Sequence, residues 1–522
     1  MSASREKKIR QELAAQGVTD PKLIREAEAK AKARKTNLLY GVIAVVFVVV
    51  AAVLLVYNSG VLQRGATALT IDGEKYTPAQ VDYYYATVRS NLVNGGYAAY
   101  YGLDTSKPLS QQTVSDTAKM LLGIEDESEM TWDEYIRDTA IETLTLRVKA
   151  AKEAEAAGMV EDEHINEEIE ATMDEIAGYA KQNGYSTKEY LKLIFGGNMT
   201  VDTFKEMVKL DDLASHYMSH YQEDLTYSVS DLEAYYQDNR DTFDVADYDY
   251  VYFRGTAPST TDADGNAVEA SDEENAAARE AALKNAEEAM KRYADGESLE
   301  DIAEALDGTF SAQTDVPKSS SAVSDWVFDS ARQEGDISVV DSDPNVYVVL
   351  FRSVGRNDYA TVDARHILFM VDSSELDSES ETYETDLQAL KDAAKQEAED
   401  ALAQWKAGAA TEDSFAEMAN ELSDDGGSNT VGGLYEKIYK GQMVTEFNDF
   451  CFAEGRKAGD TGIVYNEGGY TGYHVIYYVG ENVPYWQVEV ETALRNSDYN
   501  EWTEGLIASA DVVLESGMKY VG

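Results

Sequence analysis

The sequence predicts a multidomain α+β protein with an N-terminal transmembrane helix, a helical region, and two small domains in which an antiparallel sheet is flanked by helices. Three observations lead to this prediction. Residues 38–57 carry no charge, residues 66–243 carry apolar side chains at helical spacing, and residues 244–481 contain two similar series of short strands and helices. A length of 522 residues allows roughly three or four domains of ordinary size.

The composition excludes several classes of function. The net charge of −53 argues against a nucleic-acid partner, because binding a phosphate backbone requires a basic surface. The single cysteine, Cys451, rules out an intrachain disulfide framework and any CxxC metal or redox site. Its apolar neighbours predict a buried structural thiol rather than a reactive one.

Residues 1–57 have the pattern of a membrane anchor. Leu38 to Tyr57 is twenty residues long, and an apolar helix of that length crosses a bilayer core of about 30 Å. Residues 1–37 contain ten Lys or Arg against five Asp or Glu, so we expect this basic tail in the cytoplasm and the acidic bulk outside. A cleaved signal peptide is the alternative, since Ala66-Thr67-Ala68 offers a cleavage site, but its apolar region would be unusually long.

Residues 66–243 are predicted to be mainly helical after a short hairpin at Ala68 to Thr77. The clearest helix is Thr131 to Ala157, where apolar residues recur every three or four positions and a glycine follows as a stop. His216 and His220 stand four residues apart in a further helix. Because neither a third ligand nor the Glu of an HExxH motif accompanies them, we interpret them as packing or surface histidines, and no metal or cofactor is predicted.

The segments 244–356 and 360–481 resemble each other. Each begins with a β-rich strand, continues through helices, and ends in a second strand after a similar loop. The firmest match joins Ser324–Val340 to Asn448–Val464. We therefore predict two domains of one fold.

Two of the five histidines lie in the first and last strands of the second segment, His366 in ARHILF and His474 in GYHVIYY. Between these strands lie two helix signals, a glycine-rich loop and the sequence GQMVTEF. This order resembles a parvulin-type peptidyl-prolyl isomerase domain. In the matching register of the first segment, Tyr250 and Tyr347 replace the histidines. The resemblance thus implies a parvulin PPIase domain at 360–481 and a degenerate, non-catalytic parvulin-like domain at 244–356.

The resemblance also implies roles for particular residues. A parvulin site holds two imidazoles on adjacent strands, an acid or thiol near the substrate carbonyl, and an apolar pocket for proline. By position, the catalytic residues are His366, Asp425 and His474, with Asp424 as the alternative to its neighbour. The substrate-binding pocket is carried over to Leu434, Met443 and Phe447.

This sequence departs from the family pattern at two places near the site. The family's GGDLG is GGLYE here, from Gly432 to Glu436, and Gly469 stands where a threonine hydroxyl normally approaches the site histidine. These departures bear on activity more than on fold. No basic cluster lies near the glycine-rich loop, which argues against phosphorylated Ser-Pro or Thr-Pro as the substrate.

Two segments before the sheet domains, YLKLIFGGNMTVDTF at 190–204 and LEAYYQDNRDTF at 232–243, resemble the helical chaperone region of SurA and PrsA foldases. Residues 482–522 are predicted to be a C-terminal helix and tail. The leading hypothesis is a membrane-anchored extracytoplasmic foldase of a Gram-positive type envelope, acting on unfolded or newly exported polypeptides that contain proline. A non-catalytic holdase that grips chains with both parvulin-like domains is one alternative. A structural envelope scaffold is the other. The oligomeric state stays open, with a homodimer as one option.

Overall fold

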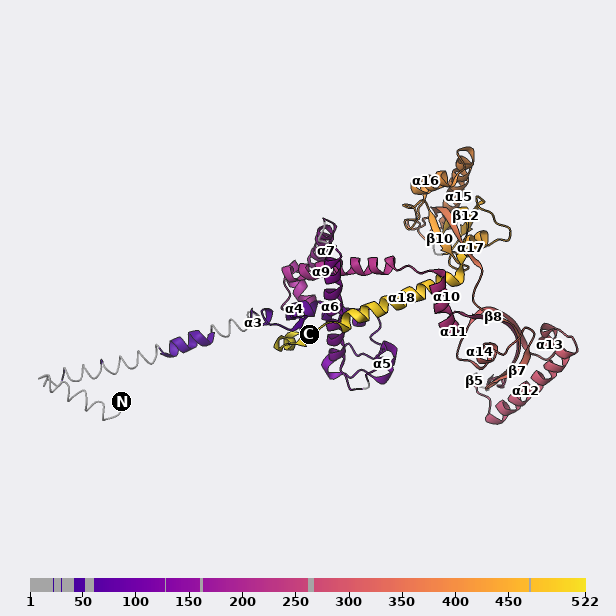
Figure 1. Cartoon of the computed structure of the whole chain (residues 1–522), viewed down its shortest axis with the longest axis horizontal. Coiled ribbons are helices and arrows are strands. Elements are labelled where there is room, and N and C mark those ends of the chain that lie inside the picture. Colours follow the sequence, from indigo (N-terminus) through magenta and orange to yellow (C-terminus); the bar gives the residue numbers. More distant parts are fainter. Residues whose placement is uncertain are drawn as a thin grey trace. The chain divides into compact units, whose positions relative to one another are not determined.

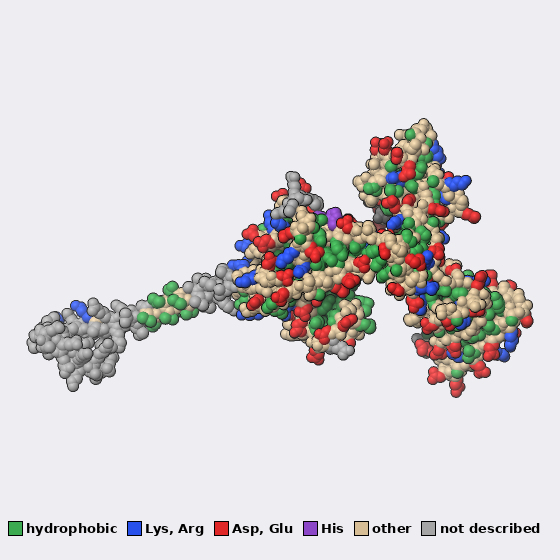
Figure 2. Space-filling model, viewed as in Figure 1, with side chains coloured by type: hydrophobic (Ala, Val, Ile, Leu, Met, Phe, Trp, Pro, Cys, Tyr) green, Lys and Arg blue, Asp and Glu red, His purple; other side chains and the backbone are tan. Residues whose placement is uncertain are grey.

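The computed structural model of the chain describes residues 22, 30, 42–51, 61–126, 128–159, 163–261, 267–468 and 471–522. The chain divides into two compact units, one made of Met1–Leu225 with Asp498–Gly522 and the other of Thr226–Ser497 (Figure 1). Acidic side chains are spread over the surface of both units, in keeping with the net charge of −53 (Figure 2).

The predicted N-terminal anchor falls mostly outside the described residues. This holds for the basic tail at 1–37, apart from two isolated positions, and for most of the span at 38–57. Residues 42–51 are helical, and most of their side chains are exposed. Within the described part of the chain, no helix is both long enough and apolar enough to cross a membrane.

The first unit is mainly helical. Its helices include α3 (Val61–Arg64), α4 (Pro78–Asn94), α5 (Asp116–Leu122), α6 (Trp132–Ala156), α7 (Glu163–Gln182), α8 (Thr187–Phe195) and α9 (Val201–Asp224). The long helix α6 buries the apolar face that the sequence predicts, with Trp132, Ile136 and Leu144 in the core. A capping box begins it, because the Thr131 hydroxyl accepts the N–H of Glu134 while the Glu134 carboxylate accepts the N–H of Thr131.

A three-stranded sheet joins the beginning of this unit to its end. β1 (Leu69–Ile71) pairs antiparallel with β2 (Glu74–Tyr76), which together form the predicted hairpin, and with β13 (Val512–Leu514). The C-terminal segment, predicted as a helix and tail, is therefore helix α18 (Tyr485–Ala508) followed by a strand. A three-residue strand whose partner lies at the other end of the chain leaves no local pattern from which to predict it.

Asp82 of α4 is a buried carboxyl group in this unit. Its side chain accepts a hydrogen bond of 2.9 Å from the backbone N–H of Gly522. Burial raises the pKa of Asp82 from 3.8 to about 6. Because the folded-state pKa lies above the unfolded one, the carboxyl group favours folding below pH 3.8, and this contribution is lost as the pH rises through 6.

We therefore expect Asp82→Asn, which keeps an acceptor for Gly522 without the charge, to stabilise the protein at neutral pH. The free energy of unfolding at pH 7 should rise by about 3 kcal/mol at most. The gain should disappear near pH 4, where wild-type Asp82 is already protonated in the folded state. Urea denaturation followed by circular dichroism at both pH values measures the free energy of unfolding of the two proteins. An equal increase at pH 7 and pH 4 would contradict the role of the buried charge.

The second unit contains two four-stranded antiparallel sheets. The first has the order β6-β3-β8-β7 and consists of β6 (Thr309–Pro317), β3 (Val245–Phe253), β8 (Asn345–Gly355) and β7 (Ile337–Ser342). Helices α12 (Asp272–Ala294) and α13 (Leu299–Ala305) pack on one face, and α14 (Ala322–Val327) packs on the other (Figure 1). A two-stranded ribbon, β4 (Thr260–Thr261) and β5 (Ala267–Val268), lies in the loop before α12.

The second sheet repeats this arrangement with the order β10-β9-β12-β11. It consists of β10 (Leu434–Ile438), β9 (Ala360–Met370), β12 (Gly472–Pro484) and β11 (Thr461–Asn466). Helices α15 (Tyr383–Ala407) and α16 (Glu412–Leu422) cover one face, and α17 (Thr445–Cys451) covers the other. Cys451 is buried in the α17 core, as predicted, and burial raises the pKa of its thiol to about 12.

The two sheets also share their strand register. Tyr250 stands opposite Val349 in the first sheet, and His366 stands opposite Ile476 in the second. The same offset therefore separates the two central strands in both domains. Because side chains alternate between the faces of a strand, this register brings Tyr250 and Tyr347 to the same face of the first sheet. Their rings lie 5.4 Å apart.

A small helical core accompanies the sheets in this unit. The last part of the region predicted to be helical, up to residue 243, contains two helices, α10 (Val229–Asp238) and α11 (Arg240–Phe243). Asn239 between them leaves the helical conformation with φ −126° and ψ 28°. Their apolar side chains pack against Trp486 and Val490 of α18. The guanidinium of Arg356 lies 3.8 Å from the centre of the Trp486 ring.

Candidate functional site

Two buried imidazoles lie side by side on the central strands of the second sheet. His366 of β9 and His474 of β12 are diagonal neighbours, because His366 stands opposite Ile476 and His474 opposite Leu368. Their side chains are only 3% and 5% exposed. The ring planes differ by 13°, and the two Nδ1 atoms are 3.2 Å apart, within hydrogen-bond distance. One of these nitrogens must therefore donate to the other.

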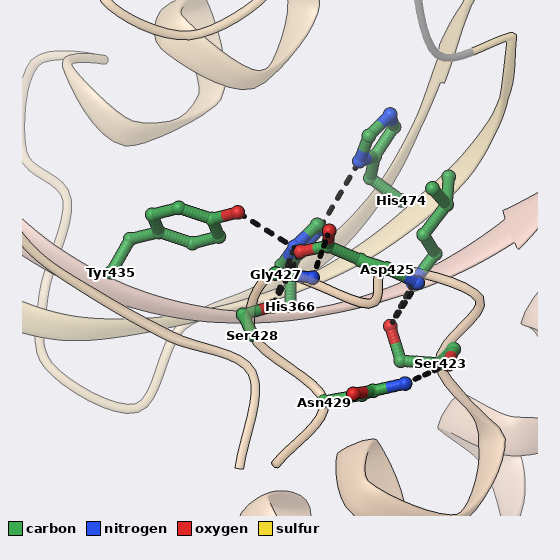
Figure 3. Close-up of polar contacts among 9 residues, drawn as sticks. His366, Ser423, Asp425, Gly427, Ser428, Asn429, Tyr435 and His474 are labelled. Atoms are coloured by element: carbon green, nitrogen blue, oxygen red, sulfur yellow. Dashed lines mark hydrogen bonds and ion pairs between the residues drawn. The ribbon is translucent and has the colours of Figure 1, made fainter. Parts of the chain in front are cut away.

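The Asp425 carboxylate completes this cluster from the loop after α16. Its Oδ2 lies 2.8 Å from His366 Nε2 and also accepts hydrogen bonds from the hydroxyls of Ser428 and Tyr435 (Figure 3). The hydrogen bond to His366 holds the pKa of Asp425 well below its usual range, against the opposing effect of burial, and the other donors add to it. Asp425 is therefore an anion at neutral pH.

The hydrogen-bond network assigns the tautomers of the histidines. Because an ionised Asp425 can only accept, His366 presents Nε2–H to the carboxylate, and in the neutral His366 imidazole Nδ1 is then the acceptor. His474 then donates from its own Nδ1–H to His366. The chain His474, His366, Asp425 is thus a directed series of hydrogen bonds that ends on a fixed negative charge.

The loop that carries Asp425 is attached directly to strand β9. The Asp424 N–H donates to the carbonyl of Leu368, and the Asp424 carboxylate accepts the N–H of Met370. Ser423 accepts the N–H of Leu368 with its hydroxyl (Figure 3). Of the two acids that the sequence left as alternatives, Asp425 is the one that contacts His366. Asp424 lies on the rim of the site and binds the backbone of β9.

A glycine allows the next part of the loop to approach the sheet. The His366 N–H donates to the carbonyl of Gly433 at 2.8 Å. Gly433 has φ +67°, and a Cβ atom there would lie 2.1 Å from the carbonyl oxygen of His366. Any other residue would therefore push the loop away from the imidazole.

An apolar cavity of about 460 Å³ opens beside the cluster. Phe447 of α17 is wholly buried and presents its ring edge-on to both imidazoles, at centroid distances of 5.6 and 6.0 Å. Met443, Val444 and Leu368 supply further apolar wall. The charged side chains that line the cavity are Asp424 and Asp425.

Five of the six predicted site residues line this one cavity: His366, Asp425, Met443, Phe447 and His474. Leu434 stands opposite Arg365 and is not among the lining residues, whereas its neighbour Tyr435 is. The reason is the alternation of side chains along β10, which directs successive residues to opposite faces. Sequence reasoning also missed Ser428, whose position in a polar loop gave no signal. Gly469 lies outside the described residues.

Comparison with known families places this site. Residues 348–481 match the family model described as the PPIC-type PPIASE domain. The chain contains a parvulin-type PPIase domain. The match begins in strand β8 of the first sheet and covers β9, β10, β11 and β12 as far as residue 481. Comparison with curated proteins gives no match.

Solved structures similar to this chain are foldases and chaperones. PrsA from Bacillus anthracis is 22% identical, and the alignment covers 29% of this chain and 59% of that one with a TM-score of 0.18. PrsA from Bacillus subtilis is 14% identical over 76% of this chain and 94% of that one, with a TM-score of 0.26. A SurA-like chaperone from Campylobacter jejuni is 15% identical over 86% and 100%, with a TM-score of 0.17. The parvulin assignment rests on the family match to residues 348–481.

Proposed function

We propose that this protein is a membrane-anchored extracytoplasmic foldase that catalyses cis/trans isomerisation of X-Pro bonds and holds unfolded chains. The observation that carries the proposal is the His474–His366–Asp425 series beside an apolar cavity of about 460 Å³ with Phe447 in its wall. Proline-containing segments of exported polypeptides are its substrates. The purified protein should accelerate isomerisation of a proline tetrapeptide, and its failure to do so would favour the holdase alternative.

The geometry suits a reaction that forms no covalent bond to the enzyme. The barrier to rotation about an X-Pro bond, about 20 kcal/mol, arises from amide resonance, which places partial negative charge on the carbonyl oxygen. Twisting the amide returns that electron density to nitrogen. A fixed anion beside the carbonyl disfavours the planar form more than the twisted one, so Asp425 can lower the barrier by differential electrostatics. The apolar wall removes water that would otherwise stabilise the planar dipole.

Holding of unfolded chains is supported by apolar side chains on the surface of the helical unit. Tyr97, Tyr100, Met120 and Leu193 are each more than half exposed. Tyrosine and methionine offer adaptable apolar contact to extended polypeptide. Suppression of aggregation of a denatured client tests this activity independently of isomerisation.

The membrane topology is a separate prediction. The uncharged run at 38–57 and the basic tail before it support a single pass with residues beyond about 66 outside the cytoplasm. Protease added to intact cells should digest the large C-terminal part and spare the tail, as detected by antibodies against each. Protection of the C-terminal part in intact cells, with digestion after lysis, would contradict this orientation.

The charge of the cavity predicts a preference among substrates. Because its charged lining residues are the carboxylates of Asp424 and Asp425, an acidic residue before proline should be disfavoured. We expect kcat/KM to fall about fivefold from Ala-Pro to Glu-Pro tetrapeptides, and to rise slightly for Lys-Pro, at low ionic strength. Asp424→Asn should reduce the difference in kcat/KM between the Ala-Pro and Glu-Pro peptides. Equal rates for all three peptides in low salt would show that the rim charge does not reach the substrate.

A further inference from the structure

A second cleft, of about 560 Å³, lies in the first sheet domain and is separate from the parvulin-like face of that domain. It opens beside the α12–α13 junction, and we call it the α12–α13 cleft. Its apolar floor is formed by Tyr293, Leu299, Phe310 and Leu350. Leu299 and Leu350 are only 4% and 2% exposed and belong to the core beneath α12 and α13. Tyr250 and Tyr347 lie on the opposite face of the sheet, in the core under α14.

The second sheet domain fills the same place with its own aromatic rings. By strand register, Leu350 stands opposite Asp249 as Tyr477 stands opposite Arg365, so Leu350 and Tyr477 are equivalent. Aligning ESLEDIAEAL with DSFAEMANEL makes Leu299 equivalent to Phe415. The glycine that follows α12 and the one that follows α15 make Tyr293 equivalent to Trp405.

In the second domain these three positions form a packed aromatic cluster. The ring centroids of Trp405, Phe415 and Tyr477 lie 5.5 to 5.9 Å from one another. In the first domain two of the three rings are replaced by leucine, while the strands and helices around them keep their arrangement. The α12–α13 cleft thus lies at the place where the sister domain packs three aromatic rings against one another.

The rim of the α12–α13 cleft is acidic. Asp249, Glu297 and Glu300 line it together with one basic residue, Arg352. Arg352 is paired with Asp249, and Glu297 is paired with Arg292 behind the rim. Glu300 is exposed at the start of α13. A ligand entering this cleft therefore meets excess negative charge around an apolar floor.

We propose that the α12–α13 cleft binds the side chain of an aromatic residue in an extended polypeptide, with a basic residue next to that aromatic one. An aromatic ring suits the apolar floor, since Trp405 and Tyr477 hold rings at the equivalent positions of the second sheet domain. The acidic rim favours a basic residue next to that ring. The site would grip a client chain without acting on proline. This proposal rests on the proposed function in one respect, namely that the ligand is an unfolded polypeptide.

Methyl NMR of the full-length chain, labelled at leucine, tests the site with three peptides: acetyl-Lys-Trp-Lys-amide, acetyl-Lys-Ala-Lys-amide and acetyl-Glu-Trp-Glu-amide. We expect the first to shift the methyl signals of Leu299 and Leu350 in a saturable manner. The alanine peptide and the acidic peptide should each bind at least about tenfold more weakly. Glu300→Gln should lower the affinity for acetyl-Lys-Trp-Lys-amide and leave the affinity for acetyl-tryptophan-amide unchanged.

The matched variant is Leu299→Phe with Leu350→Tyr, which gives the first domain the side chains of the second. It should remove binding of the basic tryptophan peptide while isomerase activity at His366 stays at the wild-type level. The methyl signals of Leu306, which packs against the same core as Leu299 and Leu350, should stay dispersed, which reports that the first sheet domain has folded. Undiminished binding in this variant, or absence of Leu299 and Leu350 shifts in the wild type, would overturn the proposal. Loss of isomerase activity without loss of peptide binding would instead count against the proposed function alone.

Discussion

Phe447→Ala is expected to remove nearly all prolyl isomerase activity and to destabilise the second unit by about 3–5 kcal/mol. Phe447 is wholly buried and contacts both site imidazoles with the edge of its ring. Its loss would enlarge the cavity and admit water beside the substrate amide. The proline ring would then lose the wall that fixes it, and the imidazoles would lose the side chain that holds their stacked arrangement.

A matched control separates lost stability from lost chemistry. Phe415 of α16 is also wholly buried, but it packs on the other face of the same sheet, next to α15. Phe415→Ala should therefore cost similar stability while leaving kcat/KM of the folded fraction near the wild-type value. Circular dichroism under the assay conditions gives the folded fraction of each variant. Equal specific activities of folded Phe447→Ala and folded Phe415→Ala would show that Phe447 does not form the substrate wall.

The relation between the two sheet domains could be predicted from sequence because it depends on strand patterns. Tyr250 and His366 lie in similar β-rich strands, and the structure gives both the same pairing offset with the following central strand. The replacement of the histidines by tyrosines can therefore be recognised from the amino-acid sequence alone. The α12–α13 cleft leaves no such pattern in the sequence, because its lining residues come from β3, β6, β8 and the α12–α13 junction, and only the fold brings them together.

The site itself could be predicted only as far as the family resemblance reached. His366, Asp425 and His474 were carried over by position, and the structure brings them within hydrogen-bond distance of one another. The resemblance places Leu434 beside the pocket and gives no role to Tyr435. The start of β10 decides which residue faces the cavity, and a five-residue strand after a glycine pair leaves that start undefined in the sequence. Strand β13 was missed because its partner is remote in sequence.

The second large effect is expected at the polar end of the cavity. Asp425→Asn keeps the shape of the side chain but removes its charge, so kcat/KM should fall about ten- to a hundredfold if the anion acts on the substrate carbonyl. Asp425→Ala should lower kcat/KM by at least the same factor. Asp372→Asn is the control, because Asp372 is an exposed acid just after β9 that accepts hydrogen bonds from the side chain and the backbone of Ser374, and its pKa is also lowered.

The imidazoles should behave as one unit with this anion. His366→Ala removes the residue that joins His474 to Asp425, so adding His474→Ala to it should cost much less than His474→Ala costs in the wild type. The pH profile provides a second readout. Because the pKa of Asp425 is depressed, its stabilising contribution is present above pH 3.8 and is lost only as the pH falls through the lower folded-state value, so no activity change between pH 5 and 8 should depend on Asp425. Full isomerase activity in folded Asp425→Asn and His366→Ala proteins would show that these residues do not carry the reaction.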